Sequence, residues 1–445
     1  MTTMISRGRT VHEVAIPSLD TGTLFEVGIE DGVFASIEPI GDATSPRDLE
    51  LWPGYVETHG HLGLPQNFDD SLDDPRVLAL QYLYHGVTHV VDMFGFPLVQ
   101  ALWDRGREES PLPYPELVHC GYAATSMRDI AGRTGHGVEF PAPVYMLGVE
   151  GDVEQVLAAN AARGATFLKV MFTDGTEQPG AARRFSKLTE RVLTDVARTT
   201  AARGIPAVID CNTREEVMRS YACGFRLFAH SVRDYVLTED DWRALAGATF
   251  VSTLSGLRPM IMYPAEFLRE YARPGFRETQ DVANLDFVAR RNQPYGIEYG
   301  LQDTRTAALE VMRRNALAAL ERQALLVGTD CGNTGAFHGY SLLGELDLLL
   351  GAGTGPSDLP PRLRHAATVD GWRFFQKLSG RAGDGHPIAI GNPATFNLLT
   401  PAAPGAPLSA LPETTVVNGV SLDRAAIERG IGALRSSESK GKVSL

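Results

Sequence analysis

Two histidines stand close together at the end of an apolar segment near the amino terminus. His59 and His61, in the run Pro53–His61, are two positions apart, so on a β-strand both side chains leave from the same face. Two imidazoles aimed in this way can bind one zinc-like cation at about 2.0–2.1 Å each. Gly60 between them lets the backbone approach a metal closely. A His-x-His pair alone is a weak signal, but it gains weight at the carboxyl end of a barrel strand, where barrel active sites lie.

Three other apolar segments carry a chemically useful side chain. Lys169 interrupts the apolar run Phe167–Phe172, and a buried unpaired lysine is costly. It either pairs with a carboxylate or serves as a metal ligand after carbamylation of its amine. His230 follows a short apolar strand and is either a satisfied core residue or a ligand. Asp330 ends a further apolar strand, where a carboxylate can bind a metal and accept a proton from a water.

Two more histidines stand in glycine-containing loops. His136 lies between Gly135 and Gly137, and His338 precedes Gly339. Both could line the mouth of the same site. Because each is in a loop, we interpret both as surface or substrate-contact residues rather than as metal ligands.

Short buried strands that alternate with amphipathic helices must position these residues. The helix expected over Leu188–Arg203 has one apolar stripe and ends at Gly204. The pattern predicts an α/β fold, a closed parallel (β/α)8 TIM barrel. A doubly wound open sheet is the alternative, but no glycine-rich phosphate loop follows the first strand. The expected strands are Gly54–Thr58, His89–Met93, Leu117–Ala123, Phe167–Phe172, Ala207–Cys211, Leu227–His230, Thr249–Leu254 and Leu325–Thr329.

Both ends of the chain have an all-β texture. An Asp31-Gly32 pair between two alternating runs predicts a hairpin in the first fifty residues. Short strands return at Ile388–Ile390, Thr395–Leu399 and Thr414–Val420. We therefore expect a small β-sandwich built from both chain ends. The predicted units are a first β-sandwich part over 1–53, the barrel over 54–387, a second β-sandwich part over 388–431 and a flexible tail over 432–445.

The composition is that of a soluble globular protein. The chain has 445 residues, a net charge of −13 and 44% hydrophobic residues, so we expect no nucleic-acid or anionic-membrane partner. No apolar run reaches the roughly 20 residues of a membrane span, and Met1–Thr10 has no apolar run typical of a secretory signal. Four scattered cysteines without a CxxC pattern indicate reduced thiols and a cytoplasmic location.

Taken in order, these signals resemble the amidohydrolase superfamily of metal-dependent hydrolases. The nearest branch is similar to imidazolonepropionases and prolidases, which tend to carry a Gly-His-Gly loop where His136 stands. The resemblance runs through nearly the whole chain and is specific only in combination. The segments that carry it are Ile29–Ile37, Pro53–His61, Gly86–Asp92, Lys169, His230, Gly328–Asp330, His338-Gly339, Gly344–Leu346 and Ala366–Thr368.

The resemblance implies a site for one or two divalent cations, with zinc expected. His59, His61 and Asp330 would hold the first cation; Lys169, if carbamylated, would bridge, and His230 would serve the second. A metal-bound water with a pKa near 7 would then attack the substrate. Asp330 would move its proton to the leaving nitrogen, and a metal, with His230 or His136, would stabilise the oxyanion.

The sequence departs from the family pattern at the fifth strand. Asp210 stands where a histidine ligand is expected. A carboxylate can still bind zinc at about 2.0–2.2 Å, but its shorter reach would alter the second metal position. Three possibilities remain open: a binuclear site that includes Asp210, a mononuclear site on His59, His61 and Asp330, or a site without metal. A second departure, at Gly391–Phe396, lies in a structural segment of the carboxy-terminal part.

The substrate is indicated only by an insertion over Arg258–Arg305. Its apolar and aromatic residues suggest a cover over the barrel that also caps a fairly large, partly apolar, peptide-like substrate. They are Met260, Met262, Tyr263, Phe267, Tyr271, Phe276 and Tyr295. Size and superfamily also agree with an amidohydrolase that trims bottromycin-type peptide natural products.

We therefore expect hydrolysis of an amide or peptide-like C–N bond in a small-molecule or peptide-like substrate. A deaminase of an amidine or heteroaromatic ring is the first alternative, but such barrels keep the fifth-strand histidine. A non-catalytic binding protein is the second alternative. It has little structural reason to keep family-like residues at five separate strand ends. A homodimer is compatible with the superfamily.

Overall fold

The first of two large β-sheets joins the two ends of the chain. The computed structural model describes residues 10–43, 49–64, 73–139, 143–148, 152–176, 182–280, 290, 302–351, 356–381, 385–403 and 405–437. This seven-stranded sheet has the order β17-β16-β15-β4-β1-β2-β3. Its strands are β1 (Thr10–Ile16), β2 (Asp20–Glu30), β3 (Val33–Asp42), β4 (Glu50–Pro53), β15 (Phe396–Leu399), β16 (Thr414–Val417) and β17 (Val420–Ser421).

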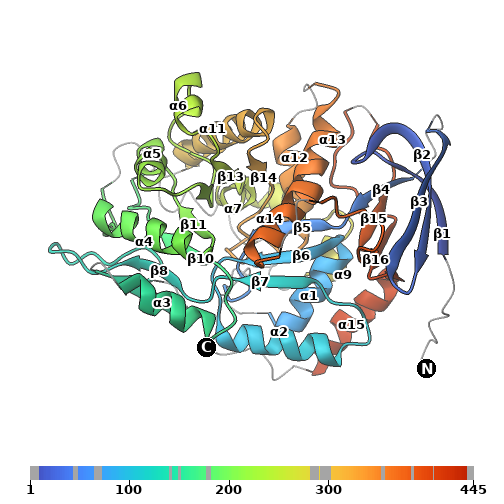
Figure 1. Cartoon of the computed structure of the whole chain (residues 1–445), viewed down its shortest axis with the longest axis horizontal. Helices are drawn as coiled ribbons and strands as arrows, with labels where there is room; N and C mark the ends of the chain where they lie inside the picture. The colour runs from blue at the N-terminus through green and yellow to red at the C-terminus, as the bar shows by residue number, and fades with distance from the viewer. Residues whose placement is uncertain are drawn as a thin grey trace.

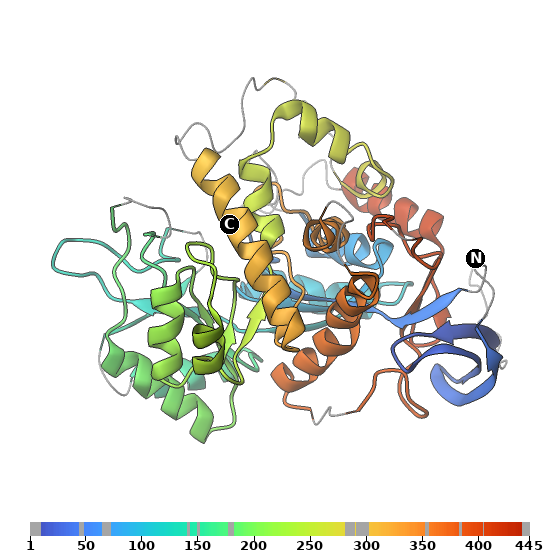
Figure 2. The same cartoon turned by 90° about the horizontal axis from the view of Figure 1, so that it is seen from above.

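This end sheet confirms that the first and last parts of the chain pair with each other. β2 and β3 form the predicted hairpin, with Asp31 and Gly32 at positive φ in the turn. β15 runs antiparallel to β4, with Asn397 opposite Trp52. The Asn397 side chain is fully buried and donates from Nδ2 to the carbonyl oxygen of Gly86, so it also fastens the sheet to the rest of the molecule. The blue strands β1–β3 lie to one side of the larger body (Figures 1 and 2).

The larger body contains parallel strands in two further sheets. One has the order β14-β13-β12-β11-β10-β8-β9 and the other the order β5-β6-β7. The expected mixed α/β architecture with a parallel sheet is therefore confirmed. The strands are β5 (Tyr55–Gly60), β6 (Val87–Asp92), β7 (Glu116–His119), β8 (Ala123–Ser126), β9 (Val144–Leu147), β10 (Leu168–Met171), β11 (Ala207–Asp210), β12 (Leu227–Phe228), β13 (Thr249–Val251) and β14 (Leu325–Leu326).

Backbone hydrogen bonds connect both edges of the three-stranded sheet to the seven-stranded one. Near β14, the amide of Asp330 donates to the carbonyl oxygen of His59 (2.8 Å), and the amide of His61 donates to that of Cys331 (2.7 Å). At the other edge, the amide of Thr166 donates to the carbonyl oxygen of His119 (3.2 Å). The end of β5 is thereby held beside the segment that follows β14.

Helices alternate with these strands along the chain. The predicted helix over Leu188–Arg203 is confirmed as α4, whose Thr189 side chain caps its amino end and whose carboxyl end is followed by Gly204 at φ +65°. The helices are α1 (Pro75–Tyr84), α2 (Pro97–Glu109), α3 (Asp152–Ala161), α4 (Glu190–Ala202), α5 (Arg214–Ala222), α6 (Glu239–Ala244), α7 (Leu254–Leu257), η1 (Arg258–Met260), α8 (Pro264–Glu270), α9 (Phe276–Thr279), α11 (Gln302–Glu321), α12 (Tyr340–Leu350), α13 (Leu359–His365), η3 (Ala366–Asp370), α14 (Gly371–Leu378) and α15 (Arg424–Ser437).

Some predicted elements are wrong in extent or type. The single strand expected over Leu117–Ala123 is interrupted near Gly121, which has φ +64°, and continues as β8. Ile388–Ile390 forms turns instead of a strand.

The expected flexible tail, residues 432–445, is also partly wrong, because α15 continues to Ser437. Ile427 and Ile431 of this helix are buried against Val77 and Leu80 of α1, and this apolar contact keeps the segment helical. Residues 438–445 lie outside the described residues.

Three aromatic residues of the 258–305 insertion, among those that the structure describes, pack into a core of their own and do not line the pocket. Phe267, Tyr271 and Phe276 are buried in a cluster that also contains Met262, Tyr340 at the start of α12, and Phe337 just before that helix. Their rings pack against one another, and the ring centroids of Tyr271 and Phe276 are 4.4 Å apart. Of the insertion's predicted residues, Met260 lines the pocket, Tyr263 is exposed and Tyr295 lies outside the described residues.

Among the helices described, none is long and apolar enough to cross a membrane.

Candidate metal centre

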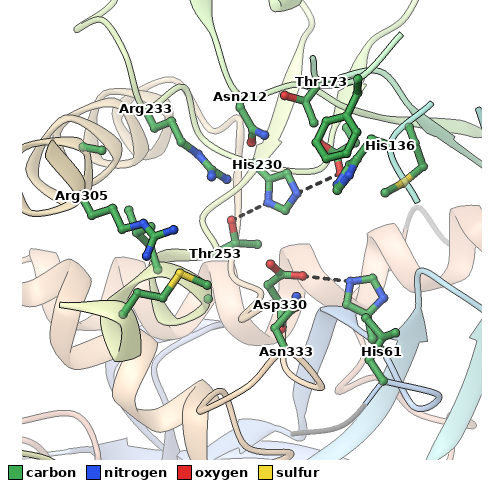
Figure 3. Close-up of a pocket in the computed structure, with 18 of the residues that line it drawn as sticks. His61, His136, Thr173, Asn212, His230, Arg233, Thr253, Arg305, Asp330 and Asn333 are labelled. Carbon is green, nitrogen blue, oxygen red and sulfur yellow. Dashed lines mark hydrogen bonds and ion pairs between the residues drawn. The ribbon is translucent and has the colours of Figure 1, made fainter. Parts of the chain in front are cut away.

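Three predicted ligands converge at the carboxyl ends of β5 and β14. The two Nε2 atoms of His59 and His61 are 3.2 Å apart. Asp330 Oδ1 lies 2.9 Å from His61 Nε2 and 3.4 Å from His59 Nε2. His61 and Asp330 also line a pocket of about 210 Å³, in which their side chains face each other (Figure 3). These three predicted residues therefore lie close enough together to hold one cation.

The hydrogen bonds of His59 leave its Nε2 atom able to bind a cation. Its Nδ1 donates to the carbonyl oxygen of Ala229 (2.9 Å), so the lone pair of the neutral ring is on Nε2. Burial, reinforced by the positive charge of Lys169, holds the pKa of His59 well below its usual value. A neutral imidazole is the form that a metal requires.

Asp330 is held in an unusual backbone conformation. Its φ is +62°, in the left-handed region that residues other than glycine rarely adopt. Burial opposes ionisation of its carboxyl, but the hydrogen bond from His61 and nearby positive charges outweigh burial and lower the pKa. Gly256 of α7 makes room for this side chain, because a Cβ atom there would lie 2.8 Å from Asp330 Oδ2.

A second group of predicted residues lies beside the first. Asp210 Oδ2 is 3.9 Å from Lys169 Nζ and 3.4 Å from His230 Nε2, and the rings of His59 and His230 are 4.8 Å apart. The other ring nitrogen of His230 is hydrogen-bonded to the hydroxyl of Thr253 (2.8 Å). Burial would raise the pKa of Asp210, but the charges of His230 and Lys169 reverse this and hold it well below its usual value.

The donor set fits a divalent cation. Two nitrogen atoms and one oxygen atom in tetrahedral contact with a cation at 2.0–2.1 Å would be separated by about 3.3–3.4 Å, close to the distances between His59, His61 and Asp330. Oδ1 of Asp210 is buried and has no hydrogen-bond partner among the described residues. An orphaned carboxylate oxygen beside such a triad is a position at which a water in the pocket would supply the missing hydrogen-bond partner.

The two loop histidines have different surroundings. His136 lines the pocket, donates from Nδ1 to Glu139 (2.6 Å) and packs against Phe185, as a substrate-contact residue would. His338 does not line the pocket, which corrects the expectation that it lies at the mouth. It is buried behind His61, to whose carbonyl oxygen its Nε2 donates (3.2 Å).

Several residues of the site were not anticipated from the sequence. Glu57 is buried behind the histidines, and its carboxylate accepts hydrogen bonds from the amides of His59 and Thr329. It could have been found by the argument used for Lys169, since it is a charged residue in a buried strand. Arg233 and Arg305 line the pocket without any motif that marks them.

Comparison with known proteins finds likeness only in structure. No family model and no curated sequence matches the chain. A bottromycin amidohydrolase is 22% identical, with a TM-score of 0.63 over 96% of this chain and 90% of that one. A putative prolidase from Bifidobacterium longum is 18% identical, with a TM-score of 0.63 over 96% and 98%. Ochratoxinase from A. niger is 15% identical, with a TM-score of 0.62 over 93% and 95%. These neighbours confirm the sequence resemblance at the level of structure: the chain has the amidohydrolase fold.

Proposed function

We propose that this protein is a metal-dependent hydrolase that cleaves an amide or peptide-like C–N bond. The observation that carries the proposal is the convergence of His59, His61 and Asp330, of which His61 and Asp330 line a pocket. The structural neighbours, which include an amidohydrolase, a putative prolidase and a phenylurea hydrolase, support the same chemistry. Trimming of peptide natural products is one use of such an activity that the first neighbour supports. The four free cysteines favour a cytoplasmic enzyme.

We infer further that the parallel strands close into a single (β/α)8 barrel. The backbone hydrogen bonds from Asp330 to His59 and from Thr166 to His119 support closure, because they join both edges of the three-stranded sheet to the segments after β14 and before β10 of the other sheet. In such a barrel the carboxyl ends of all strands meet at one face, where active sites are built. This arrangement accounts for the assembly of side chains from β5, β10, β11, β12 and the segment after β14.

The residues of the chain divide the work of hydrolysis. A divalent cation, with zinc expected, would supply a Lewis acid and an activated water. The lowered pKa of Asp330 keeps its carboxylate ionised, so that it can take a proton from the attacking water and return it to the leaving nitrogen. His230, held by Thr253, and His136, held by Glu139, are placed to donate hydrogen bonds to the developing oxyanion.

We propose one cation per chain, held by His59, His61 and Asp330. Lys169 lies 3.9 Å from the Asp210 carboxylate, a distance suited to an ammonium group. A carbamate on Lys169 would place two anions side by side in a buried site, which only additional positive charge could stabilise. The charge state of Lys169 and the number of cations are therefore linked: ammonium goes with one and carbamate with two.

The test is metal content per chain, by elemental analysis of protein purified without chelators, together with turnover of N-acyl amino acids and Xaa-Pro dipeptides. About one equivalent of metal is expected, unchanged in Asp210→Ala. Asp330→Asn should abolish turnover without changing the far-UV circular dichroism spectrum. Two equivalents, with one lost in Asp210→Ala, would overturn the one-cation proposal. The absence of metal and turnover, even after added zinc, would overturn the hydrolase itself.

A further inference from the structure

The pocket above the metal centre has a charge opposite to that of the whole protein. The chain carries a net charge of −13. Among the described residues that line the pocket, however, the only carboxylates are Asp210 and Asp330, which belong to the metal centre. Histidines aside, the remaining charged side chains there are all arginines: Arg184, Arg233 and Arg305. A substrate that reaches the metal centre therefore passes three positively charged side chains that line the pocket.

Arg233 is the lining arginine whose position is best defined by its surroundings. Its amide donates to the carbonyl oxygen of Asn212 (2.9 Å), which ties the segment after β12 to the segment after β11. Its Nε atom is buried and has no hydrogen-bond partner among the described residues, and the same holds for Oδ1 of Asn212. The adjacent acid, Asp234, accepts a hydrogen bond from the amide of Arg214 and does not line the pocket.

The side chains of Arg233 and Arg305 lie on one side of the pocket (Figure 3). The guanidinium groups of Arg233 and Arg305 turn into the pocket on the side away from His61, and Asn212 lies beside Arg233 (Figure 3). The pocket thus has a metal centre at one side and hydrogen-bond donors at the other. Guanidinium groups bind carboxylates through charge-assisted hydrogen bonds with defined geometry.

We propose that Arg233, with Arg305 as a second cation, binds a carboxylate of the substrate, and that Asn212 beside Arg233 binds a neighbouring polar group. This inference rests on the proposed hydrolase function for the position of the scissile bond. An N-acyl amino acid or peptide would place its amide over the metal centre and its carboxylate against Arg233, and the side-chain amide of Asn212 would bind a neighbouring polar group. The carboxylate has two possible sources, the chain terminus or an acidic side chain.

Binding measured by isothermal titration calorimetry on chelator-treated, metal-free protein tests the subsite without turnover. The probes are N-acetylleucine, N-acetylleucinamide and N-acetylglutamate α-amide, which carry an α-carboxylate, no carboxylate and a side-chain carboxylate. N-acetylleucine should bind the native protein roughly 10- to 150-fold more tightly than its amide, the range expected for a hydrogen bond to a charged group. Arg233→Met should remove most of this preference. Tight binding of N-acetylglutamate α-amide would assign the carboxylate to a side chain, and weak binding would assign it to the chain terminus.

Arg219→Met is the matched control, since Arg219 lies on α5, partly exposed and outside the pocket. Equal binding of N-acetylleucine and its amide to the native protein would overturn the proposal, as would equal losses in the Arg233→Met and Arg219→Met variants. Failure of the hydrolase function has a different signature. In that case the carboxylate preference and its dependence on Arg233 persist, while no amide is turned over.

Discussion

Glu57 stabilises the backbone beneath the site by accepting hydrogen bonds. Two substitutions of Glu57 can measure the contribution of these hydrogen bonds to stability apart from that of its charge. Its carboxylate is fully buried, and its Oε1 atom accepts from the amides of His59 (3.0 Å) and Thr329 (2.9 Å). Its Oε2 atom accepts from the Thr329 hydroxyl (2.6 Å). Burial raises the pKa of Glu57 to about 8. The difference in unfolding free energy between any Glu57 variant and the native protein would therefore contain two contributions, the lost hydrogen bonds and the ionisation of the carboxyl group.

The pair Glu57→Leu and Glu57→Gln avoids this mixture because neither variant has an ionisable group. Glutamine keeps an oxygen at the Oε1 position for both amides, and its amide nitrogen can donate to the Thr329 hydroxyl. Leucine leaves the two amides without an acceptor, at about 1–3 kcal/mol for each buried donor. Glu57→Leu should therefore be less stable than Glu57→Gln by about 2–6 kcal/mol.

Urea unfolding of the two metal-free variants at one pH measures this difference. Fluorescence and circular dichroism must give coincident transitions before a free energy is extracted. Hydrogen exchange at the Thr329 amide supplies a local measurement, and it should be faster in Glu57→Leu. A stability difference below about 1 kcal/mol, with equal exchange at Thr329, would refute the assignment of these hydrogen bonds.

Three further predictions concern the site and the core. Gly256→Ala should displace Asp330, since the new Cβ would lie 2.8 Å from its carboxylate. This variant should therefore have a lower kcat without unfolding. The control is Gly344→Ala in α12, where the Cβ meets open space, and it should keep full activity. Burial lowers the pKa of His85 to about 4, so the unfolded chain binds more protons between pH 6.5 and 4, and His85 alone should make stability fall as pH decreases through that window by up to about 1.4 kcal/mol per unit. Burial lowers the pKa of His89 and His119 to about 4 as well, so urea unfolding of His85→Gln should show a smaller slope than the native protein; equal slopes would refute the contribution of His85. Zinc at about 100 times its Kd should stabilise chelator-treated protein by about 2.7 kcal/mol, seen as a rise in Tm that is absent from His61→Ala; an equal rise in that variant would place the bound zinc elsewhere.

The sequence was sufficient to predict which strand ends meet, because parallel strands bring their carboxyl ends to one edge whatever their exact lengths. His59, Lys169, Asp210, His230 and Asp330 come from distant parts of the chain, yet they lie together as predicted. Strand lengths were predicted less well. β12 and β14 have two residues each, whereas their apolar runs are longer, since apolar residues also fill the turns beyond a strand.

Features that depend on tertiary context were missed. The left-handed conformation of Asp330 and Thr253 has no local signal, because neither residue type requires it. The aromatic residues of the insertion were assigned to substrate binding, but their partners Phe337 and Tyr340 lie much later in the sequence. Arg233 resembles any surface arginine until the fold turns its side chain into the pocket.

The junction between the end sheet and the larger body sets the order in which the molecule can be completed during synthesis. Asn397 fastens Gly86 across a separation of 311 residues, and β4 receives its antiparallel partner only when β15 has been made. Until then the nascent chain presents β4 as an open strand edge, which is prone to pairing with other chains. Chains that stop before β15 should therefore aggregate or require a chaperone. Closing such a long loop is also entropically slow, so we expect the pairing of β15 with β4 to be a late step of folding.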